Sequence, residues 1–352
     1  MLEGFRVAEY HFTLRVLERM ELPKFKGALL RGVLGYSLKR VCWHGSNTDM
    51  HCRQCVLHAP CPYAYLFETC TSKRLGAQPA DMPRPYVLEP PLDGKTDYAP
   101  GDRLAFGLTL VGKAIDYLPY FFAAYASQGA FGLGKDWGRY ELERVEAIEP
   151  ATRQAKALFD DGHWIPSEDT WSVDFSQLAE LAGQLSATQV TLSLVTPLRL
   201  TLSQRTRSSA KEYVDGLAAE PAFPVLLDNL LKRVALLYRV HCGRVWTDSR
   251  EALHEAAVGV RSECDTHWVP WGRTSTRQGR DLDYGGLLGR ARYSGDLRPF
   301  LPFLLLGSLI HVGEKCDAGN GLYRLVWPRA TRGGGGEREG RQYGAIPAGG
   351  RG

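Results

Sequence analysis

Hydrophobic and polar positions divide the first 150 residues into a series of strands and helices. Apolar side chains occupy alternate positions in residues 7–17, which predicts a strand. Over residues 25–41 they recur at helical spacing on one face while the other face is basic, which predicts an amphipathic helix. Two strands, an apolar helix and a last strand are expected to follow at residues 85–89, 103–111, 116–127 and 139–148. The expected order is βαββαβ.

The second half of the chain shows the same order. A hairpin at residues 154–165 and a helix at residues 175–185 are expected to connect the two halves. The second series is expected at residues 189–195 (strand), 221–240 (helix), 268–271 and 286–293 (strands), 296–312 (apolar helix) and 322–327 (strand).

One segment of each half is a near copy of the other. The segments beginning at Asp116 and Asp296 both open with Asp-x-x-Pro-aromatic and continue as an apolar helix. Each then crosses a glycine-rich turn that carries a lysine, Lys135 in the first and Lys315 in the second, and ends in a strand with aromatic and basic residues. The repeat indicates a duplication.

The βαββαβ order is typical of the ferredoxin-like (RRM-like) split, an antiparallel sheet with both helices on one face. We therefore expect an α+β fold of two tandem ferredoxin-like domains, with a cysteine-rich insertion in the first. The expected bounds are residues 1–150 for the N-terminal domain with its insertion at 42–73, 151–187 for the connecting hairpin and helix, 188–327 for the C-terminal domain with its glycine-rich loop, and 328–352 for a disordered tail rich in glycine and arginine.

Composition and net charge bear on the cellular compartment and on the kind of binding partner. The 352 residues are 44% hydrophobic and 23% charged, which is ordinary for a globular protein. No run of eighteen apolar residues occurs and the first residues do not resemble a signal peptide, so a cytoplasmic protein is expected. The net charge of +4 permits a polyanionic partner without requiring one.

The cysteines cluster in the expected insertion. In a cytoplasmic chain this favours a metal site over disulfides. We expect a structural zinc ion held by Cys42, Cys52, Cys55 and Cys61. The spacing after the Cys-x2-Cys pair is irregular, so His51, His58 and Cys70 are alternative ligands. An iron–sulfur cluster and an unmetallated buried loop are alternative interpretations.

Basic and glycine-rich stretches are the candidates for nucleic-acid contact. Arginine alternates with hydroxyl side chains between residues 273 and 298, a pattern that suits a phosphate backbone, although a solvated sheet edge would look similar. The glycine loops either bring backbone amides close to phosphates or form tight turns only. The residues expected to bind RNA are Arg273, Arg277, Arg280, Arg290, Arg292, Lys315, Gly313, Gly319, Gly321, Lys135 and Arg139.

Histidine is the natural acid–base group near neutral pH. His44 follows the first helix and lies within a turn or two of Tyr36 and Lys39 in the sequence, so these three are the candidate catalytic residues. His11 and His311 have apolar neighbours and are expected to be buried core groups. Neither a Ser/His/Asp arrangement nor a His-Glu-x-x-His motif is found in the sequence.

Several motifs together resemble one family. They are Pro23-x3-Gly27-x3-Arg31-Gly-x2-Gly35, Thr276-Arg-Gln leading to Gly285-Gly-Leu-Leu-Gly289, Ser294-Gly-Asp-Leu, and Gly307-x3-His311-Val-Gly313-x5-Gly319-x-Gly321-Leu-Tyr323. They resemble the precursor-crRNA processing endoribonucleases of the CRISPR-associated RAMP superfamily (the sixth Cas family) over residues 5–327. The cysteine run that ends in Cys61-Pro-Tyr-Ala-Tyr-Leu-Phe-Glu68 is similar to one found in a subset of that family.

The resemblance implies an activity. Family members cut CRISPR repeat RNA without a catalytic metal, by attack of a ribose 2′-OH on the adjacent phosphate, and leave a 2′,3′-cyclic phosphate. Many place a histidine near the first helix, assisted by tyrosine or lysine. Carried over to this sequence, the base is His44, with His51 and His58 as alternatives, and Tyr36 and Lys39 assist.

The expected partner is CRISPR repeat RNA, as precursor and as mature crRNA, and other CRISPR effector subunits are further candidate partners. The alternative function is a non-catalytic crRNA-binding RAMP subunit of an effector complex. A third hypothesis is a zinc-dependent protein-interaction module, which predicts no salt-dependent binding to RNA.

Overall fold

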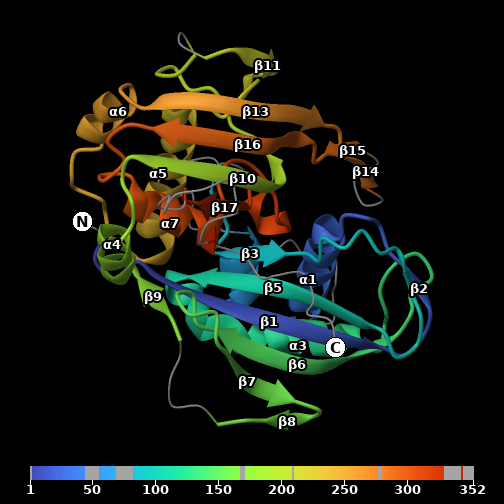
Figure 1. Cartoon of the computed structure of the whole chain (residues 1–352). Coiled ribbons are helices and arrows are strands. Elements are labelled where there is room, and N and C mark those ends of the chain that lie inside the picture. The colour runs from blue at the N-terminus through green and yellow to red at the C-terminus, as the bar shows by residue number, and fades with distance from the viewer. Residues whose placement is uncertain are drawn as a thin grey trace, which may run out of the picture. The chain divides into compact units, whose positions relative to one another are not determined.

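The computed structural model describes residues 2–43, 55–68, 82–166, 171–207, 210–275, 280–328 and 342–343. The chain divides into two compact units. Of the described residues, the N-terminal unit holds Phe5–Val173 and Leu236–Arg244, and the C-terminal unit holds residues 2–4, Asp174–Ala235, 245–328 and 342–343. Both combine antiparallel sheet and helices, so the expectation of a mixed fold of helices and antiparallel sheets is confirmed (Figure 1).

The sheet of the N-terminal unit runs in the order β3-β5-β1-β6-β7-β8, and all neighbours pair antiparallel. Its strands are β1 (Arg6–Val16), β3 (Tyr86–Glu89), β5 (Arg103–Val111), β6 (Tyr140–Ile148), β7 (Ala155–Asp160) and β8 (His163–Trp164), and β9 (Val173–Asp174) pairs with β1. The short strands β2 (Met20–Glu21) and β4 (Asp97–Tyr98) pair with each other. The predicted connecting hairpin thus extends this sheet as β7 and β8.

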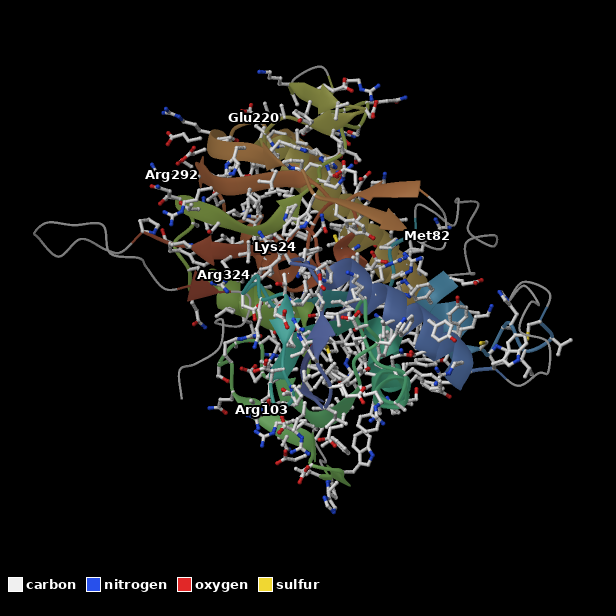
Figure 2. The ribbon with its side chains drawn as sticks, turned by 90° about the vertical axis from the view of Figure 1, so that its right-hand side faces the viewer. Lys24, Met82, Arg103, Glu220, Arg292 and Arg324 are labelled. Atoms are coloured by element: carbon white, nitrogen blue, oxygen red, sulfur yellow. The ribbon has the colours of Figure 1, made fainter. Side chains whose placement is uncertain are left out.

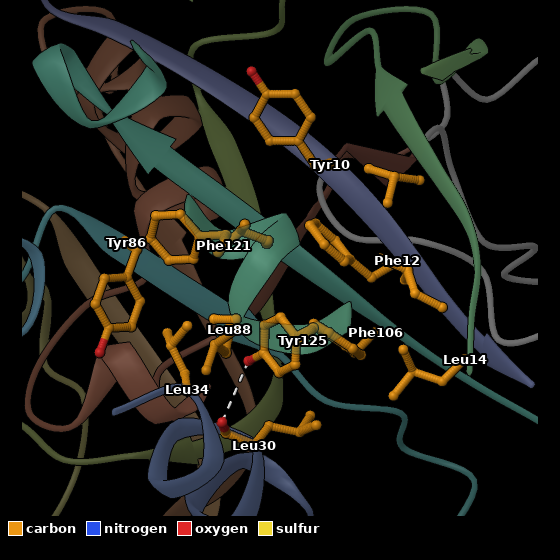
Figure 3. Packing of buried hydrophobic residues seen from close by; sticks show 14 of the residues in the cluster. Tyr10, Phe12, Leu14, Leu30, Leu34, Tyr86, Leu88, Phe106, Phe121 and Tyr125 are labelled. Carbon is orange, nitrogen blue, oxygen red and sulfur yellow. Dashed lines mark hydrogen bonds between the residues drawn. The ribbon is translucent and has the colours of Figure 1, made fainter. Parts of the chain in front are cut away.

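Two helices, α1 (Gly27–Val41) and α3 (Leu118–Gln128), contribute to the core of this unit together with the sheet. Figure 3 shows Leu30 and Leu34 of α1 beside Tyr125 of α3, whose hydroxyl donates a 3.3 Å hydrogen bond to the Leu30 carbonyl oxygen. Phe12 of β1 packs on Phe106 of β5 with ring centroids 5.4 Å apart. Each fully buried side chain of this size stabilises the fold by roughly 1.5–3 kcal/mol, so this apolar cluster fixes α1 against the sheet.

The sheet of the C-terminal unit runs in the order β13-β16-β10-β17-β18. Its strands are β10 (Gln189–Leu198), β13 (Arg261–Val269), β16 (Gly286–Ser294), β17 (Tyr323–Val326) and β18 (Gln342–Tyr343). Two hairpins accompany it, β11 (Glu212–Val214) with β12 (Leu217–Ala218) and β14 (Gly272–Ser275) with β15 (Arg280–Asp283). The helices are α4 (Phe175–Gly183), α5 (Phe223–His241), α6 (Glu251–Ala257) and α7 (Leu301–Ile310), and the residues of α5 from Leu236 on are counted with the N-terminal unit. Every residue of α7 except its proline is buried, which explains why its sequence is apolar on all sides.

The two units share one strand order. If the four main strands of each unit are numbered along the chain (β1, β3, β5, β6 and β10, β13, β16, β17), the spatial order is 2-3-1-4 in both. In both units a helix follows the first strand and another precedes the fourth. The units therefore share their topology as well as their sequence repeat.

The predicted strand at residues 268–271 is placed wrongly, since β13 spans Arg261–Val269. Its inner-facing residues Ser262 and Cys264 pair with the buried Tyr293 and Ala291 of β16, but they are small and weakly apolar themselves. The strand therefore lacks the alternation of large apolar residues by which strands are recognised. Helix α6 and the β11–β12 hairpin were not predicted either. Most of the expected disordered tail lies outside the described residues, but Gln342 and Tyr343 pair with β17.

Candidate active site and nucleic-acid interface

The C-terminal half of α1 carries two of the three predicted catalytic residues. Tyr36 is 62% exposed, and Lys39 is partly buried with its ammonium 5.9 Å from the Trp43 ring. Arg40 was not among the predicted site residues. Its guanidinium lies 3.7 Å from the ring of Phe131 and 5.7 Å from the ring of Tyr36. Two cations and a hydroxyl are thus gathered on the last turns of one helix.

One nitrogen of the Arg40 guanidinium lacks a hydrogen bond in the described part of the chain. This nitrogen, Nη1, is buried but has no hydrogen-bond partner among the residues that the structure describes. A buried donor without a partner is costly, and a guanidinium is shaped to donate two hydrogen bonds to a phosphate. Lys39 and Arg40 also lie in the last turn of α1, where positive charges interact favourably with the negative end of the helix dipole. This is a structural reason for basic residues here. The dipole does not account for the unsatisfied Nη1 atom.

A buried polar contact ties the end of α1 to the glycine turn after α3. The Ser37 hydroxyl donates to Gln128 Oε1 at 2.7 Å, and Gln128 Nε2 donates to the Gly132 carbonyl oxygen at 2.9 Å. Gly132 has φ +83°, and a Cβ atom there would lie 2.0 Å from the Trp137 carbonyl oxygen. Only glycine fits at that position. This contact holds Phe131 next to Arg40.

The predicted RNA-binding residues of the same turn lie at its surface. Lys135 and Arg139 are both exposed. Arg139 forms an ion pair with Glu18 at 2.7 Å, which raises the pKa of Arg139 and lowers that of Glu18. Because the pair is exposed, salt and competing phosphates can replace it.

In the C-terminal unit the glycine loop is a rigid structure that follows α7. Gly313, Gly319 and Gly321 all have positive φ, and a Cβ atom on Gly321 would lie 1.9 Å from the Val312 carbonyl oxygen. Thr196 of β10 donates to the Gly319 carbonyl oxygen and accepts from the Leu322 N–H, at 2.7 and 2.9 Å. The loop conformation is therefore determined by its own backbone and by β10.

Lys315 lies on this loop in a left-handed conformation. Its ammonium donates to the Asp283 carbonyl oxygen and lies 4.7 Å from the Tyr284 ring. Burial lowers the pKa of Lys315, and the nearby charge of Arg199 lowers it further. The lysine is therefore held in one orientation at the edge of the loop.

Arg199, at the end of β10, was not predicted as a site residue and lies at the centre of this region. It is 9% exposed. Its Nη1 donates to Asp283 Oδ2 at 2.9 Å and to the Gly285 carbonyl oxygen at 2.7 Å, and its Nε donates to Glu314 Oε2 at 3.2 Å. Burial alone would raise the pKa of Asp283, but hydrogen bonds from the Gly285 N–H and Arg199 lower it. Arg199 therefore joins the loop to the sheet.

Arg290 and Arg292 are exposed on the same face of β16. They lie opposite Ser193 and Thr191 of β10, and Ser193 in turn lies opposite Arg324 of β17. Figure 2 shows Arg292 and Arg324 on one flank of this unit. Cationic and hydroxyl side chains thus alternate across three neighbouring strands of this sheet face, β16, β10 and β17.

Acidic residues of β13 interrupt this face. Glu263 and Asp265 lie opposite Arg292 and Arg290, and Arg292 Nη1 is 3.4 Å from Glu263 Oε2. Exposed pairs of this kind hold their partners weakly. The sheet face therefore carries arginines that a competing anion can take over from these carboxylates.

Part of the predicted site lies outside the described residues. These are His44, His51, Cys52, Cys70 and Arg277. Arg273 and Arg280 belong to the paired strands β14 and β15, of which the structure describes the backbone. His58 is described and is neighboured by Cys55, whose carbonyl oxygen accepts from the His58 N–H at 3.0 Å.

The described cysteines do not by themselves make a metal site. Cys42, Cys55 and Cys61 are all partly buried. Among the residues whose placement is described, no three His, Cys, Asp or Glu side chains gather closely enough to hold a metal ion. The predicted four-cysteine zinc site therefore stays a prediction, because one of its ligands, Cys52, lies outside the described residues. Nor does any helix in the described ranges have both the length and the apolar character needed to cross a membrane.

Two family models match the chain. Residues 192–323 match the model described as CRISPR-associated endoribonuclease Cas6, and residues 5–170 match a model described as an N-terminal domain. The Cas6 match covers β10 to β17 and includes Arg199, the glycine loop and the arginines of β16. A comparison with curated proteins finds no match.

Three solved structures with a similar fold are described as a Cas6 protein or as a complex that contains one. A chain of a partial Cas6-RT-Cas1–Cas2 complex and a chain of a Cas6-RT-Cas1–Cas2 complex each match 99% of this chain with a TM-score of 0.57 and 12% identity. This chain spans 49% of the first and 31% of the second. A Thermus thermophilus Cas6 in a product complex matches 90% of this chain and 98% of its own, with a TM-score of 0.53 and 15% identity. At these identities the likeness concerns the fold.

Proposed function

We propose that this chain is a Cas6-like RAMP protein that binds CRISPR repeat RNA and cuts it as an endoribonuclease, by transesterification without a catalytic metal. The match of residues 192–323 to the Cas6 endoribonuclease model supports the substrate and the enzyme class. The fold shared with a Cas6 in a product complex supports the same conclusion.

The proposed reaction needs three kinds of group. A base takes the proton of a ribose 2′-OH, whose oxygen attacks the adjacent phosphorus. Cations stabilise the charge that develops on the phosphorane oxygens. An acid then gives a proton to the departing 5′-oxygen, which leaves a 2′,3′-cyclic phosphate on one product and a 5′-OH on the other.

We assign these roles to the end of α1. His44 is the proposed base, with His51 and His58 as alternatives, and the Tyr36 hydroxyl and Lys39 ammonium are the assisting donors. We add Arg40 as a phosphorane-stabilising cation. The observation that carries this placement is the clustering of Tyr36, Lys39 and Arg40 on the last turns of α1, where the Arg40 guanidinium lies 5.7 Å from the Tyr36 ring and 3.7 Å from the Phe131 ring.

The RNA contacts extend beyond that site. We propose Lys135 and Arg139 in the N-terminal unit, and Arg273, Arg277, Arg280, Arg290, Arg292 and the Gly313–Gly321 loop with Lys315 in the C-terminal unit. The rows of arginine and hydroxyl side chains across β16, β10 and β17 support the second group. Such contacts make binding salt-dependent.

We further propose that both units are ferredoxin-like domains that arose by duplication. The shared strand order 2-3-1-4 and the Asp-x-x-Pro-aromatic motif near the start of both α3 and α7 support this. We retain structural zinc as a separate proposal, with Cys42, Cys52, Cys55 and Cys61 as ligands, and no step of the reaction depends on it.

The experiment that tests the proposed function uses labelled repeat RNA in EDTA. Wild-type protein is expected to cut it, and to leave uncut a matched RNA whose 2′-OH at the cut site is replaced by hydrogen. His44→Ala is expected to abolish cleavage and keep binding.

Each other result identifies a different function. Tight binding of both RNAs without cleavage would leave a crRNA-binding subunit. Cleavage of the 2′-deoxy RNA would show a different nuclease chemistry. Absence of RNA binding at low salt would favour a protein-interaction module.

A further inference from the structure

Two aromatic side chains stack on each other beside the glycine loop of the C-terminal unit. Tyr213 lies on β11, and Trp268 lies on β13. Their ring centroids are 4.3 Å apart and their planes are 17° from parallel. They come from distant parts of the sequence, so only the fold brings them together.

Tyr213 is the outer member of the pair. Trp268 is partly buried, whereas Tyr213 is 50% exposed. In a nearly parallel stack one face of the tyrosine ring is covered by the indole. With half of the side chain still exposed, the second face is open to solvent.

The backbone holds the Tyr213 hairpin in place. The Ala218 N–H donates to the Leu200 carbonyl oxygen at 2.9 Å, and the Leu202 N–H donates to the Gly216 carbonyl oxygen at 2.7 Å. These bonds join the β11–β12 hairpin to the segment that follows β10. The open ring face is therefore presented from a fixed position.

Arg199 connects this stack to the glycine loop. Its guanidinium carbon lies 5.5 Å from the centre of the Trp268 ring, and the same side chain donates to Glu314 of the loop. Asp283 and Glu314 neutralise Arg199, so it positions neighbouring groups more than it attracts phosphate. An RNA strand that reaches Lys315 passes close to the stack.

We propose that Tyr213, supported by Trp268, is a platform on which an unpaired nucleobase of the bound RNA stacks. The inference rests on the proposed RNA-binding function and adds a contact to a base, where the contacts assigned above reach the RNA backbone. Single-stranded RNA is commonly held by bases stacked on aromatic rings, because every base offers a flat face.

A packing role alone explains the stack less well. An aromatic ring that serves only to fix a hairpin gains most when it is buried. Here Tyr213 and its neighbour Val214 are 50% and 45% exposed, although the hairpin is already fixed through its backbone. The exposed apolar surface is therefore left for a ligand.

The test measures RNA affinity and base stacking together. Repeat RNAs are prepared with 2-aminopurine at one unpaired position each, and its fluorescence and the dissociation constant are followed with full-length protein. Wild type and Tyr213→Phe are expected to quench the probe at one position or at neighbouring positions. Tyr213→Ala is expected to remove that quenching and to weaken binding about 5- to 150-fold. The slope of affinity against salt should not change, because no phosphate contact is lost.

Two further variants separate the alternatives. Trp164→Ala removes a 53% exposed aromatic side chain of the N-terminal unit and is expected to leave binding unchanged. Tyr213→Leu keeps apolar bulk without an aromatic face and is expected to behave like Tyr213→Ala. Wild-type affinity in either Tyr213→Ala or Tyr213→Leu would overturn the platform and leave the proposed function standing. If wild-type protein bound no RNA at all, both proposals would fail.

Discussion

Ser37 of α1 donates a 2.7 Å hydrogen bond to Gln128 of α3, and both side chains are buried. Through its amide nitrogen Gln128 also holds the Gly132 carbonyl oxygen. The candidate catalytic helix and the glycine turn are thus joined by one chain of hydrogen bonds. Within such a chain each member orients the next.

Removal of the first donor should destabilise the protein. Ser37→Ala leaves Gln128 Oε1 buried without its partner, which is expected to cost about 1–3 kcal/mol of unfolding free energy. Ser127→Ala is the matched control, since its hydroxyl donates to the carbonyl oxygen of Ala124 in the same helix. Urea denaturation measures both. Equal midpoints for the two variants would contradict the role given to Ser37.

Arg40 should matter for the chemical step. Arg40→Ala is expected to reduce the single-turnover cleavage rate at saturating RNA about 100- to 1000-fold, as for loss of one transition-state donor. The cleavage rate of Arg40→Lys should lie between those of the wild type and Arg40→Ala, because lysine keeps the charge and loses the paired donors. Arg103→Ala removes an exposed guanidinium that is paired with Glu143, and should cut at the wild-type rate. Full activity in Arg40→Ala would remove Arg40 from the mechanism.

Glu9 should make stability depend on pH. Burial raises the pKa of Glu9 to about 7, against the opposing charge of Arg153 and with the support of Glu89. Because this pKa lies above the ordinary 4.5, the stability that Glu9 contributes is fully present below pH 4.5. That contribution is lost as the pH rises through 7. Between pH 5 and pH 8 the free energy of unfolding of the wild type should fall by on the order of 1–3 kcal/mol more than that of Glu9→Gln.

The comparison with Glu9→Gln is needed because His11 acts in the opposite sense. Burial lowers the pKa of His11, so its contribution grows as the pH rises. Urea midpoints of both proteins at a series of pH values give the difference directly. Parallel curves for the two proteins would show that Glu9 titrates normally.

Gly321 should tolerate no side chain. Gly321→Ala places a Cβ atom against the Val312 carbonyl oxygen in addition to the strain of a positive φ. Gly216→Ala has nearly the same φ, +78° against +76°, but meets only the end of the Arg207 side chain at 3.4 Å. Gly216→Ala is expected to cost about 1–2 kcal/mol and Gly321→Ala several times more. Thermal melting compares them, and similar losses would mean that the loop can move.

The cysteine cluster can be tested by its metal content. Purified protein is expected to contain about one zinc ion per chain by elemental analysis. Cys55→Ser should lose it, while Cys242→Ser should keep it, because burial raises the pKa of Cys242 to about 11 and keeps it a thiol. Cleavage in EDTA should persist in both variants. A metal-free wild type, or a fully loaded Cys55→Ser, would exclude the proposed zinc site.

Most strands and helices could be predicted because each buries one face. In α1, Leu30, Leu34 and Leu38 recur at helical spacing and all three are buried. In β5 the predicted bounds equal the observed Arg103–Val111. The bounds of strand β13 could not be predicted, since Ser262, Cys264 and Thr266, which alternate with its exposed residues, are small and weakly apolar.

The sequence by itself determined the order of the main elements, the repeat and the basic character of α1. These features depend on periodic burial and local charge, which follow from residues that are close together in the sequence. The tertiary structure decided which side chains meet. Arg40 and Phe131, Arg199 and Glu314, and Tyr213 and Trp268 are far apart along the chain, and their contacts depend on strand order and loop conformation. No local pattern encodes such pairs, so these contacts became visible only in the folded chain, whereas Tyr36 and Lys39 could be proposed from the sequence.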